Sequence, residues 1–258
     1  MARVLLVVPC FNEATRLRGD DFLRASLPGH QLAFHFVDDG STDGTSELLA
    51  SLAVREPGRV THSRLPQNLG KGEAVRAGML TGVGGGHEPN DYVGFWDADL
   101  ATPLDELLTF VDTLEARRDI DIVIGARVAL LGRRIDRKLY RHAYGRVFAT
   151  AVSRLLSLEV YDTQCGAKLF RVNDDLASVL EGPFLSRWIF DVEILARYVA
   201  RYEARGVEIG ERVVELPLRV WTDVAGSKVG VRDAARAFVE LGLIGRRYHQ
   251  ALGTRRAR

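Results

Sequence analysis

The sequence contains little cysteine and no long apolar run, and both absences restrict what the protein can be. Its two cysteines, Cys10 and Cys165, are too few for a disulfide framework, and no Cys/His spacing is typical of a zinc site. No uninterrupted apolar run reaches the roughly 18–20 residues that span a bilayer, and no small-residue cleavage pattern follows the apolar N-terminus. We therefore expect a reduced, cytoplasmic chain that meets a membrane only peripherally, at the cytoplasmic face.

A large excess of charge of either sign is absent as well. Lys and Arg number 35 against 34 Asp and Glu, a formal net charge of +1. This balance excludes a generally basic nucleic-acid binder and a generally acidic chain, because a net charge of +1 is too small to produce the strong electrostatic field that either class needs. We expect no nucleic acid partner. Local asymmetry remains, since Arg127–Arg146 holds seven basic residues against one acidic residue, Asp136.

The 258 residues favour one large domain, or one domain with an appendage. In the first half, short apolar runs alternate with amphipathic stretches. The predicted strands are Val4–Val8, Leu32–Val37, Arg59–His62, Tyr92–Trp96 and Ile120–Gly125. The predicted helices are Ala14–Leu27, Thr45–Arg55, Lys71–Thr81 and Pro103–Arg117. This alternation predicts a Rossmann-like, doubly wound α/β fold, with a mostly parallel sheet and helices on both faces.

The second half has a looser pattern. It contains strand candidates at Lys168–Val172 and Arg212–Val220 and helix candidates at Leu139–Leu156, Phe184–Tyr202 and Val231–Gln250. The stretch Leu139–Leu156 follows basic residues, so it fits either an amphipathic helix at a lipid headgroup interface or a core helix with a solvated basic end. Periodicity alone favours the core helix.

Four polar segments stand out in the first half, most of them directly after a predicted strand. They are Pro9–Glu13, Asp38–Gly44, Asn68–Gly72 and Asp97–Asp99. In doubly wound sheets ligands bind at the carboxyl ends of the strands, so these segments predict a cleft at that edge.

Each polar residue of this cleft also has a structural interpretation. Asp97 and Asp99 suit a hard divalent cation such as Mg²⁺, but Asp99 also suits a helix cap ahead of Pro103. Taken alone, the Asp-x-Asp pattern favours the cap. Asp39 fits either a turn or an acceptor of hydrogen bonds from a base or ribose. Lys71, at a helix start, fits either a solvated side chain or a cation beside phosphates.

In order and spacing, these four segments resemble the successive motifs of family 2 glycosyltransferases of GT-A fold. Segments of the second half resemble the dolichyl- or polyprenyl-phosphate β-glucosyltransferases, and these are Asp162–Phe170, Arg187–Glu193 and Trp221–Lys228. The resemblance implies an inverting hexosyltransferase with a divalent metal, Mg²⁺ or Mn²⁺. It implies a polyprenyl-phosphate acceptor and a nucleotide-sugar donor, with UDP-glucose favoured and GDP-mannose as the alternative.

The same resemblance implies roles for individual residues. Donor binding falls to Pro9, Phe11, Glu13, Asp39, Lys71, Asp97, Ala98 and Asp99, of which Asp97 and Asp99 would hold the metal. It divides residues 1–230, the GT-A domain, into a nucleotide-sugar half, 1–125, and an acceptor half, 126–230. Residues 231–258 form a C-terminal helix and basic tail. After Asp99, Leu100 and Pro103 match mannosyl relatives, whereas Ala101 and Thr102 match glucosyl relatives.

The acceptor determines the remaining chemistry. An ionised lipid phosphate needs no strong base, and its repulsion from the donor would be offset by Arg133, Arg134, Arg219, Ser227 and Lys228. Arg127 and Lys228 would add positive charge near the reacting phosphates. A sugar hydroxyl needs a base, for which Asp162 and Asp191 are the candidates, although both also fit capping and ion pairing.

Two alternatives to this function remain. One is a transferase that acts on a soluble or lipid-linked sugar hydroxyl, and the other is a catalytically silent nucleotide-sugar-binding protein. The sequence gives no prediction of the oligomeric state.

Overall fold

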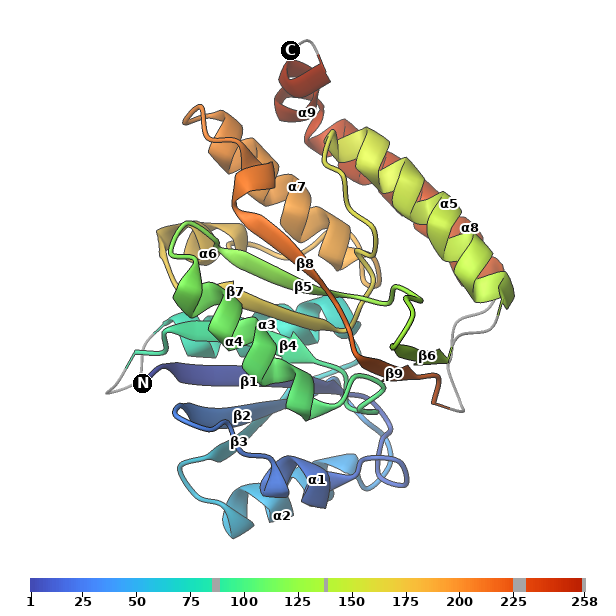
Figure 1. Ribbon diagram of the computed structural model, residues 1–258. Coiled ribbons are helices and arrows are strands. Elements are labelled where there is room, and N and C mark those ends of the chain that lie inside the picture. Colours follow the sequence, from blue (N-terminus) through green and yellow to red (C-terminus); the bar gives the residue numbers. More distant parts are fainter. Residues whose placement is uncertain (85–88, 137–138, 225–230, 257–258) are drawn as a thin grey trace.

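The computed structural model of the protein describes residues 1–84, 89–136, 139–224 and 231–256, and the side chains of these residues except 139–143, 231–234 and 253–256 (Figure 1). Its centre is a seven-stranded sheet of order β3-β2-β1-β4-β7-β5-β8. The strands are β1 (Arg3–Cys10), β2 (Gln31–Asp38), β3 (Val60–Arg64), β4 (Tyr92–Trp96), β5 (Ile122–Ala126), β7 (Ala167–Arg171) and β8 (Val213–Pro217). β7 runs antiparallel to β4 and β5, and the other pairs are parallel. The mostly parallel sheet is thus confirmed.

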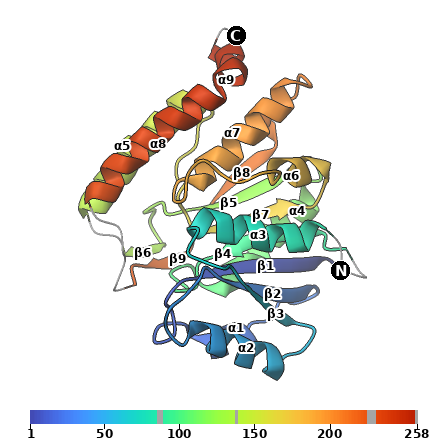
Figure 2. The same ribbon diagram turned by 180° about the vertical axis from the view of Figure 1, so that it is seen from behind.

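Helices cover both faces of this sheet, as expected from the near-continuous apolar strands. In β1, Leu5 and Val7 face one core, and Leu6 and Val8 face the other. The first core is covered by α3 (Lys71–Val83), α6 (Asp174–Val179) and α7 (Phe190–Glu203), and the second by α1 (Gly19–Arg24), α2 (Thr45–Arg55) and α4 (Leu107–Ala116). Figure 1 shows α4 in front of the sheet, and the reverse view in Figure 2 shows α3 in front. The doubly wound arrangement is confirmed.

The second half adds elements beyond the sheet. Short 3₁₀ turns are η1 (Leu104–Glu106) and η2 (Ile209–Glu211), and the remaining helices are α5 (Leu139–Leu156), α8 (Val231–Arg247) and α9 (His249–Arg256). A separate two-stranded parallel sheet joins β6 (Arg134–Asp136) to β9 (Val220–Thr222). α5 and α8 run side by side at one side of the molecule (Figures 1 and 2). There the ring of Phe148 packs edge to face against that of Phe238, with the ring centroids 5.5 Å apart.

Helix α5 has the core position that periodicity favours, because Phe148, Val152 and Leu156 are buried in the same core as α7. Within the described residues no helix combines the length and the apolar composition needed to cross a bilayer.

Three predicted elements are wrong in extent. The helix expected over Phe184–Tyr202 begins only at Phe190, as α7. The helix expected over Ala14–Leu27 is a loop followed by the short α1. After Glu13 the chain makes a single turn, in which the Glu13 carbonyl accepts the N–H groups of Arg16 and Leu17 at 2.9 and 2.8 Å, and α1 begins only at Gly19. The strand expected over Arg212–Val220 is divided into β8 and β9. At the division, Glu106 Oε1 accepts the N–H groups of Arg219 and Val220 at 3.1 and 3.3 Å, so the chain leaves the main sheet.

Candidate active site

The loops after β1 and β2 interlock. The Asn12 N–H donates to Ser41 Oγ at 3.0 Å, and Asn12 Oδ1 accepts the Thr42 N–H at 2.9 Å. The Glu13 N–H donates to Thr45 Oγ1 at 2.8 Å, and the Glu13 carboxylate lies 3.6 Å from Arg16 Nε. The predicted donor residues Pro9, Phe11 and Glu13 thus lie at or beside a fixed junction of two loops, at the carboxyl edge of the sheet.

Asp39 holds the third polar segment. Its Oδ1 accepts the Leu69 N–H at 2.7 Å, and its Oδ2 accepts the Gly70 N–H at 2.9 Å and the Asn68 amide at 3.0 Å. Burial raises the pKa of Asp39, and the two N–H groups offset this in part. Its buried neighbour Asp38 accepts the Ser41 N–H at 2.8 Å and closes its own turn. Both carboxylates therefore hold loop backbone in place, and the role of Asp39 in binding a base or ribose stays a prediction.

Lys71 joins the third segment to the fourth. It begins α3, and its Nζ lies 2.5 Å from Asp97 Oδ1. Burial lowers the pKa of Lys71, but the charges of Asp97, Asp191 and Asp99 outweigh it and raise that pKa. The side chain is therefore an ammonium, 24% exposed, at the N-terminus of a helix. A cation in this position can stabilise phosphate groups.

Asp97 and Asp99 lie close enough to affect each other. Burial and the charge of Asp97 raise the pKa of Asp99. Asp99 Oδ1 accepts the Ala101 N–H at 3.0 Å across Leu100, whose φ is 52°, and the small Ala98 between the carboxylates is buried. Asp99 therefore closes a local turn, and the expected helix cap is wrong, because η1 begins after Pro103 without a side-chain cap.

This pair fits a divalent cation. Two carboxylates that repel each other beside the sheet edge suit Mg²⁺ or Mn²⁺, which bind oxygen ligands. Among the described residues no group of three or more His, Cys, Asp or Glu forms a complete metal centre. The remaining ligands of a cation on Asp97 and Asp99 would therefore be water and diphosphate oxygens of a bound donor.

Asp191, at the start of α7, is paired with a buried lysine. Its Oδ1 lies 2.5 Å from Lys168 Nζ, which also donates to the carbonyl of Cys165 at 2.6 Å. Lys168 is 2% exposed and Asp191 5%. Burial raises the pKa of Asp191, and the charges of Lys168 and Lys71 oppose that rise. Asp191 is thus a buried carboxylate between two ammonium groups.

Asp162 is likewise engaged, by Arg127. The guanidinium donates to both carboxylate oxygens at 2.6 and 2.7 Å, and the Arg127 N–H adds a third contact at 3.1 Å. Burial lowers the pKa of Arg127, but Asp162 outweighs it and raises that pKa. Glu215 on β8 orients this loop by accepting the N–H groups of Tyr161 and Asp162 at 2.7 and 2.8 Å. Arg127 and Asp162, both predicted catalytic residues, therefore form one ion pair.

The predicted acceptor residues are more dispersed. Arg219 lies at the junction of β8 and β9, and its Nε is 3.3 Å from Glu106 Oε1. Arg133 and Arg134 lie where the connection after β5 enters β6, and Arg134 is exposed. Ser227 and Lys228 lie outside the described residues.

Sequence reasoning missed two residues that organise the site. The predicted site gives Lys168 no role, although a lysine between Ala167 and Leu169 in an apolar run is a usable signal of a buried ion pair. Arg187 has no role of its own in the predicted site. Its guanidinium donates to the Asn68 carbonyl at 2.9 Å, and its own carbonyl accepts the Gly72 N–H at 3.1 Å. Arg187 thus fastens the segment before α7 to the third polar segment.

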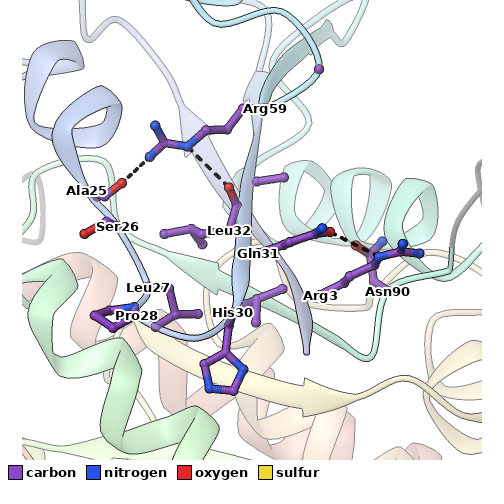
Figure 3. A pocket seen from close by; sticks show the side chains of 13 residues that line it. Arg3, Ala25, Ser26, Leu27, Pro28, His30, Gln31, Leu32, Arg59 and Asn90 are labelled. Carbon is purple, nitrogen blue, oxygen red and sulfur yellow. Dashed lines mark hydrogen bonds between the residues drawn. The ribbon is translucent and has the colours of Figure 1, made fainter. Parts of the chain in front are cut away.

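A hollow of about 570 Å³ lies at the opposite edge of the sheet, beside the first residues of β1 and β2 (Figure 3). One of its two arginines, Arg59, donates to the carbonyls of Leu32, at 3.3 Å, and Ala25. The guanidinium therefore ties α1 and the loop after it to β2 and β3. This hollow is separate from the candidate active site.

Comparison with known proteins identifies the family. The family described as Glycosyl transferase family 2 matches residues 5–176, which include the four polar segments. The chain belongs to this family. A dolichyl-phosphate beta-glucosyltransferase from Dictyostelium discoideum is 31% identical to this glycosyltransferase over 237 residues, 87% of this chain and 68% of that protein. Polyprenol monophosphomannose synthase from Mycolicibacterium smegmatis is 27% identical over 256 residues, 95% of this chain and 88% of that protein.

Solved structures agree on the fold. Glucosyl-3-phosphoglycerate synthase from Mycobacterium tuberculosis, in complex with Mn²⁺ and UDP-glucose, aligns with 98% of this glycosyltransferase and 79% of that chain, with a TM-score of 0.59 at 19% identity. The GT-A fold predicted from the sequence is therefore confirmed, as is the resemblance to dolichyl-phosphate β-glucosyltransferases.

Proposed function

We propose that this glycosyltransferase transfers glucose from UDP-glucose to a polyprenyl phosphate, with inversion at the anomeric carbon and with a divalent cation. The observation that carries the proposal is the pairing of both candidate bases. Asp191 is bound by Lys168 at 2.5 Å and Asp162 by Arg127 at 2.6 Å. Both carboxylates are engaged by cations and are poorly placed to take a proton from an acceptor hydroxyl, which favours an acceptor that arrives already ionised.

The donor occupies the carboxyl edge of the first half in this proposal. Pro9, Phe11 and Glu13 line the uridine, and Asp39 fixes the segment Asn68–Gly70 beside it. The diphosphate lies toward Asp97, Ala98 and Asp99. Two similar proteins support this choice, since one solved neighbour is in complex with UDP-glucose and the Dictyostelium relative is named a glucosyltransferase. GDP-mannose remains the alternative donor.

Charge at this edge supports the transfer itself. A divalent cation on Asp97 and Asp99 would supply a Lewis acid for the departing diphosphate. Lys71, an ammonium 2.5 Å from Asp97, is near enough to share in neutralising that charge. The charge of the paired Asp191 also raises the pKa of Lys71 and so favours its ionised form.

The acceptor half, 126–230, supplies positive charge for the lipid phosphate. We assign this charge to Arg133, Arg134, Arg219 and Lys228, and a hydrogen bond to the phosphate to Ser227, with Arg127 shaping the loop between them and the donor. Two anions approach each other in this reaction, and nearby cations lower the cost of that approach.

A membrane surface is the place where such an acceptor is found, and we propose peripheral contact with it. Exposed large apolar side chains of the described residues gather in the second half of the chain. On the paired helices they are Val147 on α5 and Phe238, Val239 and Leu243 on α8. Exposed apolar groups on an amphipathic helix pair suit contact with the headgroup boundary.

The decisive experiment incubates the protein with Mn²⁺ or Mg²⁺ and one of several nucleotide sugars, using a short polyprenyl phosphate in detergent as acceptor, and analyses products by mass spectrometry. A polyprenyl-phosphate-linked hexose is expected, with UDP-glucose as the best donor. Transfer to a soluble sugar hydroxyl but not to the lipid phosphate would overturn the acceptor. A protein that binds UDP but shows neither sugar transfer nor slow hydrolysis of UDP-glucose would be a catalytically silent binder.

A further inference from the structure

An apolar turn projects between β5 and β6. The Arg133 N–H donates to the Leu130 carbonyl at 3.0 Å, which closes a four-residue turn, and Gly132 in the third position has a φ of 81°. These features are typical of a type II turn, in which the second residue lies at the corner. That residue is Leu131, whose exposure is 104%, and Leu130 beside it is 49% exposed. The backbone conformation of the turn thus keeps both leucine side chains exposed to solvent.

The base of this turn is fastened to the candidate active site. The Arg134 N–H donates to the Arg219 carbonyl at 2.9 Å, where β6 pairs with β9. On the other side, the Arg127 N–H donates to Asp162 Oδ2 at 3.1 Å. Whatever the leucines bind is therefore held at a fixed place relative to the acceptor half.

The residues that follow are basic. Neither the Arg133 nor the Arg134 guanidinium has a hydrogen-bond or ion-pair partner within residues 1–84, 89–136, 139–224 and 231–256. The acidic residue closest along the chain is Asp136, which is exposed on β6. Two exposed leucines followed by two arginines match the acyl boundary and the phosphates of an anionic bilayer.

We propose that Leu130 and Leu131 insert into the interface of an anionic phospholipid bilayer and dock the acceptor half on it. Arg133 and Arg134 then lie at the level of the lipid phosphates, where the phosphate of a membrane-embedded acceptor also lies. This inference rests on the proposed lipid-phosphate acceptor, which makes a bilayer rather than a protein the occupant. It assigns the docking contact to a short turn, in addition to the faces of α5 and α8.

The test is flotation with vesicles of phosphatidylcholine and phosphatidylglycerol, without donor or acceptor. A Leu130→Ser/Leu131→Ser variant is compared with wild type and with Val54→Ser, which alters an 80%-exposed apolar residue of α2. The double variant should lower the partition coefficient about tenfold or more, because each leucine loses its apolar burial in lipid. Val54→Ser should leave it unchanged. Equal flotation of all three proteins, or no flotation of wild type, would overturn the proposal.

Activity assays separate this proposal from the proposed function. With a short, water-soluble polyprenyl phosphate, the double variant should turn over like wild type, since the leucines touch neither substrate. With a long-chain acceptor embedded in the vesicles, its rate should fall about as much as its partitioning. Wild type that floats but transfers nothing would overturn the proposed function and leave the docking turn supported. A wild-type dimer that the double variant abolishes in sedimentation would overturn the bilayer as occupant.

Discussion

The backbone of Gly166 lies directly against the carboxylate of Asp97. A Cβ atom at position 166 would lie 1.8 Å from Asp97 Oδ2, and the Gly166 carbonyl accepts the Asp97 N–H at 3.0 Å. Gly166 enters β7, whose neighbour β4 ends one residue before Asp97. The start of β7 therefore determines where the first carboxylate of the Asp-x-Asp segment lies.

Replacing Gly166 with Ala should displace that carboxylate. Because the added methyl cannot share space with Oδ2, Asp97 must rotate away from Lys71 and from a cation. Metal-dependent affinity for UDP should fall by about tenfold or more, or ~1.4 kcal/mol, in titration calorimetry. Gly242→Ala on α8 is a matched control, since a Cβ there meets nothing within 4 Å. Equal UDP affinity in wild type and Gly166→Ala would contradict the close contact.

Asp99 provides a direct test of the metal assignment. With Asp99→Ala the proposed site loses one of its two carboxylates, so UDP binding should become weak and nearly independent of Mn²⁺ or Mg²⁺. Calorimetric titrations of UDP with and without the metal measure this. The control is Asp105→Ala, which removes an acidic residue of η1, and this variant should retain the metal dependence. A variant lacking Asp99 that binds UDP as wild type does, with the same metal dependence, would rule out this ligand.

The Lys168–Asp191 pair predicts a strong dependence of stability on both partners. Lys168→Met leaves Asp191 buried without its closest cation, which should lower the free energy of unfolding by about 3–5 kcal/mol. Lys168→Met/Asp191→Leu removes both charges and should recover much of that loss. Urea unfolding of the single and double variants gives the coupling energy. If the double variant is as unstable as the sum of its single variants, the two side chains do not interact.

The sequence predicts the sheet well because its signals are local. Near-continuous apolar runs such as Tyr92–Trp96 indicate the strands, and amphipathic stretches such as the one that begins at Lys71 indicate the helices. The alternation of strands and helices indicates a parallel sheet. The loop that begins at Glu13 escapes prediction because the N–H groups of Glu13 and Ala14 bond to Thr45 and Asp43, about thirty residues away. No helical periodicity reports such a contact.

The candidate site divides in the same way. Motif spacing places Asp39, Lys71 and Asp97 at one edge, where the structure also has them. Motif spacing does not reveal which basic side chain pairs with which carboxylate. Lys168 reaches Asp191 across 23 positions, from a strand that runs antiparallel between two others. This strand reversal, which brings the lysine under α7, has no local sequence signal.

The buried thiol of Cys165 gives a prediction on pH. Burial, with a smaller contribution from the charge of Asp162, raises the pKa of Cys165 to about 11. A raised thiol pKa means that the unreactive protonated form dominates at pH 8, with roughly one thiolate in a thousand. Cys10 is also buried, and burial raises its pKa well above the usual value. The folded protein should therefore not react with Ellman's reagent at pH 8, and both thiols should react at once in denaturant.

Raising the pH separates thiol ionisation from simple inaccessibility. If ionisation limits the reaction, the labelling rate of Cys165 should increase about tenfold per pH unit up to about pH 11 while the protein stays folded. Circular dichroism at each pH verifies that it does. Complete labelling of folded protein at pH 8 would show a thiolate at this position, directly beside the loop that Asp162 and Arg127 hold. That result would require a chemical role for Cys165, whereas its burial beside the ion pair indicates packing.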